Sequence, residues 1–177
     1  MRILEWFAPA VPLEGVDWEA VYREEMSRVF NYFRYRGFER ATAEDLTSAT
    51  FEKAWRARER YRKDRAAVST WLLAIGRNVA IDHFRRSRPE VPLAEDAATG
   101  EETPETAALR AGQSRRLSEL LRALPERERE LLALKYGADA TNRAIATLTG
   151  LSESNVGTIL HRTIGALRAR WDEGGPQ

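Results

Sequence analysis

TNRAIATLTGLSESNVGTILHRTIGALRARW, residues 141–171, contains two helical patterns separated by a glycine. Thr141 precedes the first pattern and Ser152 the second, and both hydroxyls suit a residue that caps a helix amino terminus. Gly150 lies between the patterns, where a sharp turn needs a left-handed backbone. The small and aliphatic positions have the spacing of a helix-turn-helix: Ala146, Gly150, Val156 and Ile159. The segment therefore predicts a helix-turn-helix, with an ordinary helical hairpin as the alternative.

The second helix of such a motif enters the major groove of DNA. Its exposed polar side chains can reach base edges or phosphates: Ser154, Asn155, Thr158 and Arg162. Arg143 and the amino terminus of the second helix suit phosphate contacts. Gly157 costs about 1 kcal/mol in a helix relative to alanine and offers no side chain to a base. It either permits a close approach of the backbone to DNA or is simply tolerated.

The chain upstream of this motif also has helical patterns. Because it lacks alternating apolar runs bounded by turns, we expect an all-α protein. Asp17 can cap a first helix, which ends at Gly37. One face of that helix is apolar: Val21, Tyr22, Val29 and Phe33.

Two further helices are expected in the amino-terminal half. Thr42 and Asp45 have the spacing of a capping box that opens the second helix. Its periodicity directs three apolar side chains to the core: Leu46, Phe51 and Trp55. The third helix begins at Ser69 or Thr70, in TWLLAIGRNVAIDHFRRSR, residues 70–88.

This third helix and the loop before it are basic. The cluster can follow a nucleic-acid backbone: Arg62, Lys63, Arg65, Arg77, Arg85, Arg86 and Arg88. Taken singly, each of these side chains can equally be solvated or paired, and Asp82 has the spacing to pair with an arginine three or four residues later. Trp71 falls on the core face, and Phe84 can offer a stacking face to a base.

Charge is strongly segmented along the chain, although the formal net charge is only +1. It is −4 over residues 1–52, +8 over 53–88, −6 over 89–109 and +5 over 110–171. Two basic blocks separated by an acidic one indicate two surfaces for a polyanion. The acidic segment combines prolines with small residues and has no period, which predicts a flexible linker.

Composition narrows the classes of function. The chain has no cysteine, and His83 and His161 are far apart in sequence, so we expect no metal site and no cofactor. His83 has no nucleophile or carboxylate at a recognisable spacing, so it is not expected to be catalytic. No window approaches the roughly 18 apolar residues of a membrane-spanning helix, and a lone Arg2 is a poor start for a signal peptide. We therefore expect a cytoplasmic protein without membrane insertion.

Three stretches in this order carry a resemblance to a known family. They are AEDLTSATFEKAW, TWLLAIGRNVAIDHFRRSR and LPERERELLALKYGADATNRAIATLTGLSESNVGTILHRTIGALR. The chain resembles the extracytoplasmic-function (ECF) sigma factors, group IV of the sigma-70 family. The resemblance implies two small helical domains joined by the acidic linker. The expected division is an extension (1–16), sigma region 2 (17–88), linker (89–109), sigma region 4 (110–171) and tail (172–177).

The resemblance also implies a function and partners. It predicts a sigma factor without catalysis of its own that binds core RNA polymerase through the clamp helices and the flap. Region 2 would recognise and open the minus-ten promoter element as single-stranded DNA, and region 4 would bind the minus-thirty-five element as duplex. Members of the family are usually restrained by an anti-sigma factor, so the resemblance also predicts an anti-sigma factor for this chain.

Individual residues take roles from the same resemblance. Asn78 stands where the family has an asparagine near unstacked bases, and its amide can both donate to and accept from a base edge. A solvated asparagine on the helix surface is the alternative. The exposed side of the second helix holds the polymerase-binding candidates: Asp45, Ser48, Glu52, Lys53 and Arg56. Ser48 and Ala49 replace the Gln and Glu of many relatives, which weakens this assignment.

Two other classes of protein stay open on the residues alone. A free-standing helix-turn-helix regulator explains the carboxy-terminal half but leaves the basic block at 53–88 without a role. An enzyme using carboxylates such as Glu44, Asp45 and Glu52 lacks a histidine nearby to complete a metal site.

Overall fold

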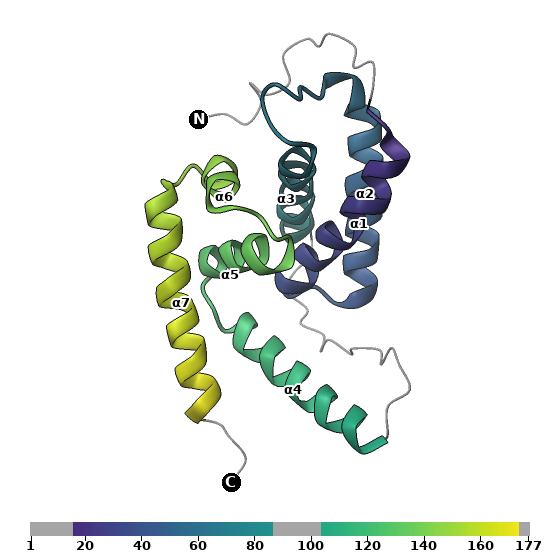
Figure 1. Cartoon of the computed structure of the whole chain (residues 1–177). Helices are drawn as coiled ribbons and strands as arrows, with labels where there is room; N and C mark the ends of the chain where they lie inside the picture. Colours follow the sequence, from purple (N-terminus) through teal and green to yellow (C-terminus); the bar gives the residue numbers. More distant parts are fainter. Residues whose placement is uncertain (1–15, 87–103, 174–177) are drawn as a thin grey trace.

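The computed structural model describes residues 16–86 and 104–173, which form α-helices and no β-strand (Figure 1). The all-α expectation is therefore confirmed, with one group of helices before residue 87 and a second group after residue 103. The bounds are α1 (Trp18–Tyr35), α2 (Arg40–Ala57), α3 (Val68–Arg86), α4 (Pro104–Arg122), α5 (Glu126–Leu132), α6 (Asn142–Thr149) and α7 (Glu153–Glu173).

Helices α1, α2 and α3 pack around one apolar core. Its buried side chains come from all three helices: Val29, Phe33, Leu46, Leu72, Ile75 and Val79. Gly76 lies on the packed face of α3, where a Cβ would be in ordinary van der Waals contact with the Phe33 ring at 3.5 Å. Trp71 is buried against Trp18 and Tyr61, which confirms its place in the core.

The ends of α1 follow the sequence signals. The Asp17 carboxylate accepts hydrogen bonds from the backbone N–H groups of Glu19 and Ala20, at 3.0 and 3.1 Å. Gly37 follows the helix with a φ of 91°, the left-handed conformation expected where a helix stops. Tyr22 departs from its expected place on the buried face: it is 50% exposed and meets the edge of Phe51 at the surface.

Helix α2 corrects three expectations. It begins at Arg40, with Glu39 before it, so Thr42 lies inside the first turn and caps nothing. Trp55 is 53% exposed instead of facing the core, and the Arg58 guanidinium lies over its ring, 4.1 Å from the centroid. Phe51 is only partly buried.

Two further boundaries differ by a few residues. Helix α3 begins at Val68, one residue before Ser69 and two before Thr70, the two expected starts. Helix α4 begins at Pro104, so the last residues of the expected linker are helical; proline and the acidic Glu105 both suit the first turn of a helix. The other residues of the linker, 89–103, lie outside the described part of the chain.

The carboxy-terminal helices contain the helix-turn-helix. Thr141 caps α6 by accepting from the Ala144 N–H at 3.1 Å, and Ser152 accepts from the Asn155 N–H at 3.2 Å. Gly150 has a φ of 75° in the turn between them. Val156 is fully buried, which confirms that its side chain fixes α7 to the domain.

The contribution of the Asp17 cap to the stability of α1 can be tested by substitution. Asp17→Ala should lower the free energy of unfolding by about 1 kcal/mol, because two N–H groups of the first turn lose their acceptor. Urea denaturation followed by circular dichroism measures the change. Glu39→Ala is the matched control: Glu39 occupies the same position on α2 and makes no capping hydrogen bond, so its removal should change little.

Candidate nucleic-acid interface

Arg77 lies on the side of α3 that contacts the carboxy-terminal helices, and Asn78 is the next residue along the same helix. Both side chains are half-buried. The Asn78 amide makes no hydrogen bond to another residue in the described ranges, so its donors and acceptor are available.

Arg77 is not directed to open solvent. Its Nε donates to Glu130 Oε1 on α5 at 2.7 Å, and Nη1 donates to the Leu148 carbonyl oxygen at 3.1 Å. The side chains of Arg77 and Glu130 are only 20% and 13% exposed. Burial lowers the pKa of Arg77, but the hydrogen bond and charge of Glu130 outweigh it and raise the pKa above its usual value.

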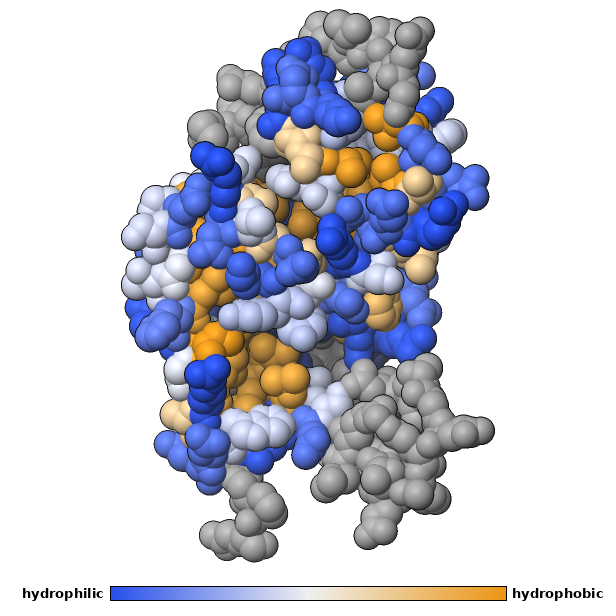
Figure 2. Space-filling view, viewed as in Figure 1, coloured by the Kyte–Doolittle hydropathy of each residue, from blue (hydrophilic) through white to orange (hydrophobic). Residues whose placement is uncertain are grey.

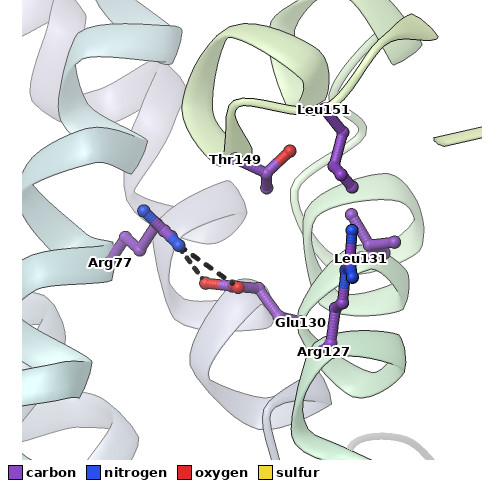
Figure 3. A pocket seen from close by; sticks show the side chains of 6 residues that line it. All are labelled: Arg77, Arg127, Glu130, Leu131, Thr149 and Leu151. Carbon is purple, nitrogen blue, oxygen red and sulfur yellow. Dashed lines mark hydrogen bonds and ion pairs between the residues drawn. The ribbon is translucent and has the colours of Figure 1, made fainter. Parts of the chain in front are cut away.

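A cavity of about 230 Å³ opens beside this ion pair (Figure 3). It is lined from α3, α5 and the helix-turn-helix by Arg77, Arg127, Glu130, Leu131, Thr149 and Leu151. In the close view Arg77 extends from α3 toward Glu130, while Arg127 lies on the far side of the carboxylate. The cavity therefore belongs to the junction between the two groups of helices.

The other basic residues of the cluster remain at the surface. Arg85 and Arg86 are exposed at the end of α3, as are Lys63 and Arg65 in the preceding loop. Arg62 is held by Asp64, at 3.0 and 2.9 Å. Arg88 lies outside the described residues. The expected pairing of Asp82 with an arginine of its own helix is wrong, because Asp82 accepts from Lys53 of α2 at 3.3 Å instead.

The neighbouring aromatic and imidazole groups also have definite places. Phe84 is 42% exposed and stacks on Phe38, with ring centroids 4.7 Å apart. His83 meets the same Phe38 ring edge-on at 5.4 Å, so it is partly packed. The Arg36 guanidinium also lies over the Phe84 ring, 5.4 Å from its centroid, so Phe84 is already engaged by both Phe38 and Arg36 at the basic end of α3.

The start of α7 presents a polar surface. Its exposed side chains are Ser154, Asn155, Thr158 and Arg162. Arg162 is ion-paired with Glu128 of α5 at 3.1 Å, and Arg143 of α6 with Glu153 at 3.4 Å, but both arginines are more than two-thirds exposed. A Cβ on Gly157 would lie 3.6 Å from Asn142 Nδ2, so this glycine faces α6 and an alanine would fit.

The outer side of α2 gathers the five expected polymerase contacts. All are exposed: Asp45, Ser48, Glu52, Lys53 and Arg56. Arg56 pairs with Glu52 one turn away, and Lys53 with Asp82 of α3. Figure 2 shows apolar surface between α7 and α4, and a second apolar area over α1 and α2 in the upper right of the view. Leu117 of α4 is 41% exposed, and Leu167 of α7 is partly buried.

Two absences hold within the described residues. No helix there is long and apolar enough to cross a bilayer. No group of three or more histidine, cysteine, aspartate or glutamate side chains in those ranges could hold a metal ion.

Helix packing, a helix-turn-helix and basic surfaces define a two-domain helical protein of the DNA-binding class. A family model described as sigma-70 region 2 matches residues 21–90, and one described as sigma-70, region 4 matches residues 114–167. The chain belongs to the ECF sigma factors of RNA polymerase.

Individual relatives agree with this assignment. RNA polymerase sigma factor YlaC of Bacillus subtilis is 30% identical over 149 residues, covering 81% of this chain and 86% of YlaC. The ECF sigma factor BldN of Streptomyces coelicolor is 30% identical over 170 residues; the match covers 94% of this chain but only 64% of BldN.

Solved structures share the fold. A structure of CnrH in complex with the cytosolic domain of CnrY superposes with a TM-score of 0.69 at 22% identity, over 89% of each chain. The sigma factor RpoE in complex with the anti-sigma factor NepR from Bartonella quintana has a TM-score of 0.70 at 16% identity, over 86% of this chain and 95% of RpoE.

Replacing Gly150 tests whether the turn of the helix-turn-helix depends on a left-handed backbone. Gly150→Ala should destabilise the carboxy-terminal domain by about 1–2 kcal/mol, because the left-handed backbone is unfavourable for any residue with a Cβ. Thermal unfolding measures the loss. Gly165→Ala on α7, where a Cβ meets nothing within 4 Å, should instead stabilise by about 0.5–1 kcal/mol. Equal effects of the two substitutions would contradict the role given to the turn.

Proposed function

We propose that this sigma factor binds core RNA polymerase and directs transcription initiation by recognising minus-ten and minus-thirty-five promoter elements. One observation carries the proposal: a single chain holds a basic helix with an available asparagine and, after it, a helix-turn-helix with an exposed polar first turn. The two surfaces suit single-stranded and duplex DNA respectively. The protein acts in the cytoplasm as a binding subunit and contributes no catalytic group.

The minus-ten element is assigned to α3. Asn78 takes an unstacked base through its amide, and Phe84, which is 42% exposed, would stack on a neighbouring base once Arg36 leaves its ring. The phosphates of the same strand lie against the basic side chains of α3 and its preceding loop: Arg62, Lys63, Arg65, Arg77, Arg85, Arg86 and Arg88. Of these, Arg77 must first leave its ion pair with Glu130.

The minus-thirty-five element is assigned to α7 and the turn before it. Ser154, Asn155 and Thr158 lie on the exposed side of the first two turns, within reach of base edges. Arg162 and Arg143 bind phosphates. The pair between Arg143 and Glu153 is exposed on both sides and contributes little stability, whereas Arg162 must leave Glu128, whose side chain is only 22% exposed.

Core polymerase is assigned two surfaces. The exposed polar side of α2 meets the clamp helices through Asp45, Ser48, Glu52, Lys53 and Arg56. The apolar surface between α4 and α7 suits the flap, because an exposed leucine there gains by leaving water. An anti-sigma factor is proposed as the restraining partner, and the fold shared with sigma factors solved in such complexes supports it.

The direct test combines binding and transcription. The purified chain should co-purify with core RNA polymerase and direct run-off transcription from DNA upstream of its own gene. Omitting the chain should abolish the transcript. Duplex binding without any transcript in the presence of core polymerase would contradict the proposal and favour a free-standing regulator.

Asn78 gives the sharpest residue-level test. Asn78→Ala should reduce promoter opening roughly tenfold while leaving polymerase affinity unchanged, because a good side-chain contact to a base contributes about 1–3 kcal/mol. Permanganate footprinting of unpaired thymines measures the opening. Gln113→Ala, which removes an exposed amide on α4, is the control. Loss of helicity or of polymerase affinity in Asn78→Ala would show that the residue is structural.

A further inference from the structure

An apolar patch crosses the hairpin formed by α1 and α2, and Figure 2 shows apolar surface over these two helices. We call it the aromatic patch; it consists of Tyr22, Met26, Phe51 and Trp55. Tyr22 and Met26 are four residues apart on α1, and Phe51 and Trp55 are four apart on α2, so each pair shares one face of its helix. The Tyr22 and Phe51 rings meet edge-on, with centroids 4.8 Å apart. The four side chains therefore form one surface that spans both helices.

The aromatic patch leaves much apolar area in water. Tyr22 is 50% exposed, Met26 40% and Trp55 53%, and Phe51 is partly buried. The Arg58 guanidinium lies over one face of the Trp55 ring and still leaves more than half of that side chain open. Single exposed apolar side chains are common on protein surfaces, whereas a group of adjacent ones marks a contact site. The patch thus has the composition of a surface that another apolar group covers.

The amino-terminal segment of the same chain supplies such a group. Residues 1–15, MRILEWFAPAVPLEG, lie outside the described part of the chain and are rich in large apolar side chains. These are Met1, Ile3, Leu4, Trp6, Phe7, Val11 and Leu13. A sequence this short cannot enclose a core of its own, and Pro9 and Pro12 disfavour a continuous helix. Its apolar side chains therefore gain by packing on an existing surface.

The segment joins the described chain close to the aromatic patch. Val16 is the first described residue, and α1 begins two residues later at Trp18. Tyr22 lies about 6 Å further along the helix axis, at 1.5 Å per residue. Helix α2 runs back toward the start of α1, which brings Trp55 to the same end of the hairpin (Figure 1). A segment of this length extends to about 50 Å, so it can cover the whole patch.

Covalent attachment favours this occupant over one that binds from solution. A segment tethered next to its site is present there at an effective concentration on the order of millimolar. A second copy of this chain, or a separate protein, has to overcome that advantage. The position of the segment and its apolar content thus point to the same occupant.

We propose that residues 1–15 fold back and cover the aromatic patch, with Trp6 and Phe7 packing against Tyr22 and Trp55. Trp6 and Phe7 are adjacent and carry the largest apolar area of the segment, and aromatic rings gain from meeting other rings. The Tyr22 hydroxyl can stay at the rim in contact with water. The contact involves neither promoter DNA nor core polymerase, so this inference does not depend on the proposed function.

A spin label on the segment tests the contact in the full-length chain. The chain has no cysteine, so Ala8→Cys gives a unique attachment site for a nitroxide beside Trp6 and Phe7. In heteronuclear NMR spectra the amides of Arg23 and Met26 should lose signal severalfold relative to the chemically reduced label, because a nitroxide broadens nearby nuclei. The amide of Arg168, near the end of α7, should keep its signal.

Two matched variants relate the broadening to the patch. Trp55→Ser in the labelled chain should restore the Arg23 and Met26 signals severalfold, because the segment loses an aromatic contact. Tyr136→Ser removes a ring that is 52% exposed outside the patch and should leave the broadening unchanged. Trp6→Ser combined with Phe7→Ser removes the contact from the side of the segment and should also restore the signals. This variant keeps the proposal testable if Trp55→Ser disturbs α2.

Three results would overturn the proposal. Unbroadened Arg23 and Met26 amides in the labelled chain would show that the segment does not cover the patch. Broadening that persists in the variant with Trp6 and Phe7 replaced would show that these side chains do not hold it. Broadening in a mixture of isotope-labelled chain without nitroxide and nitroxide-labelled chain without isotope would identify a second copy as the occupant.

Discussion

The ion pair between Arg77 and Glu130 links the amino-terminal helices to the carboxy-terminal helices at a buried point of their contact. Both groups are largely buried, so removing one leaves an uncompensated charge, which typically costs about 3–5 kcal/mol. Separating the domains carries no such penalty, because both charges return to water. The pair therefore fixes how the domains dock more than how tightly they dock. Two other residues support the same docked arrangement. Glu126 pairs with Arg36, and Gly137 has no Cβ to meet the Asn31 backbone oxygen, from which it would lie 2.8 Å.

Features encoded within a few residues were predictable from the sequence. The caps at Asp17, Thr141 and Ser152 and the left-handed Gly150 depend on neighbours no more than four residues away, and all four are present. Trp55 was misplaced because periodicity alone assigns an aromatic ring to the core, whereas an arginine one turn later covers it at the surface. Helical starts were likewise uncertain where no side chain caps the helix, as at α2.

In the candidate site, too, some features were predictable from the sequence and others depended on residues far away in the chain. The basic cluster, the polar start of α7 and the exposed side of α2 follow from composition and helical spacing, and their side chains are exposed in the described ranges, with Arg62 and Arg77 only partly so. Glu130 and Glu126 were not foreseen. Their arginine partners lie 53 and 90 residues away, a separation at which no spacing rule applies, and in sequence both glutamates belong to an ordinary charged helix. The docked position of Arg77 needed the tertiary structure.

The pair between Lys53 and Asp82 has a consequence for the order of binding events. Lys53 belongs to the surface proposed for polymerase, and Asp82 lies one turn from Asn78 on the helix proposed for DNA. A ligand that engages Lys53 withdraws a cation from Asp82 and so alters the field along α3. By thermodynamic reciprocity, DNA that changes Asp82 must alter affinity at Lys53 by the same factor. For an exposed pair this factor is modest, equivalent to at most about 1 kcal/mol. It nevertheless couples the binding of a ligand on α2 to the binding of a ligand on α3.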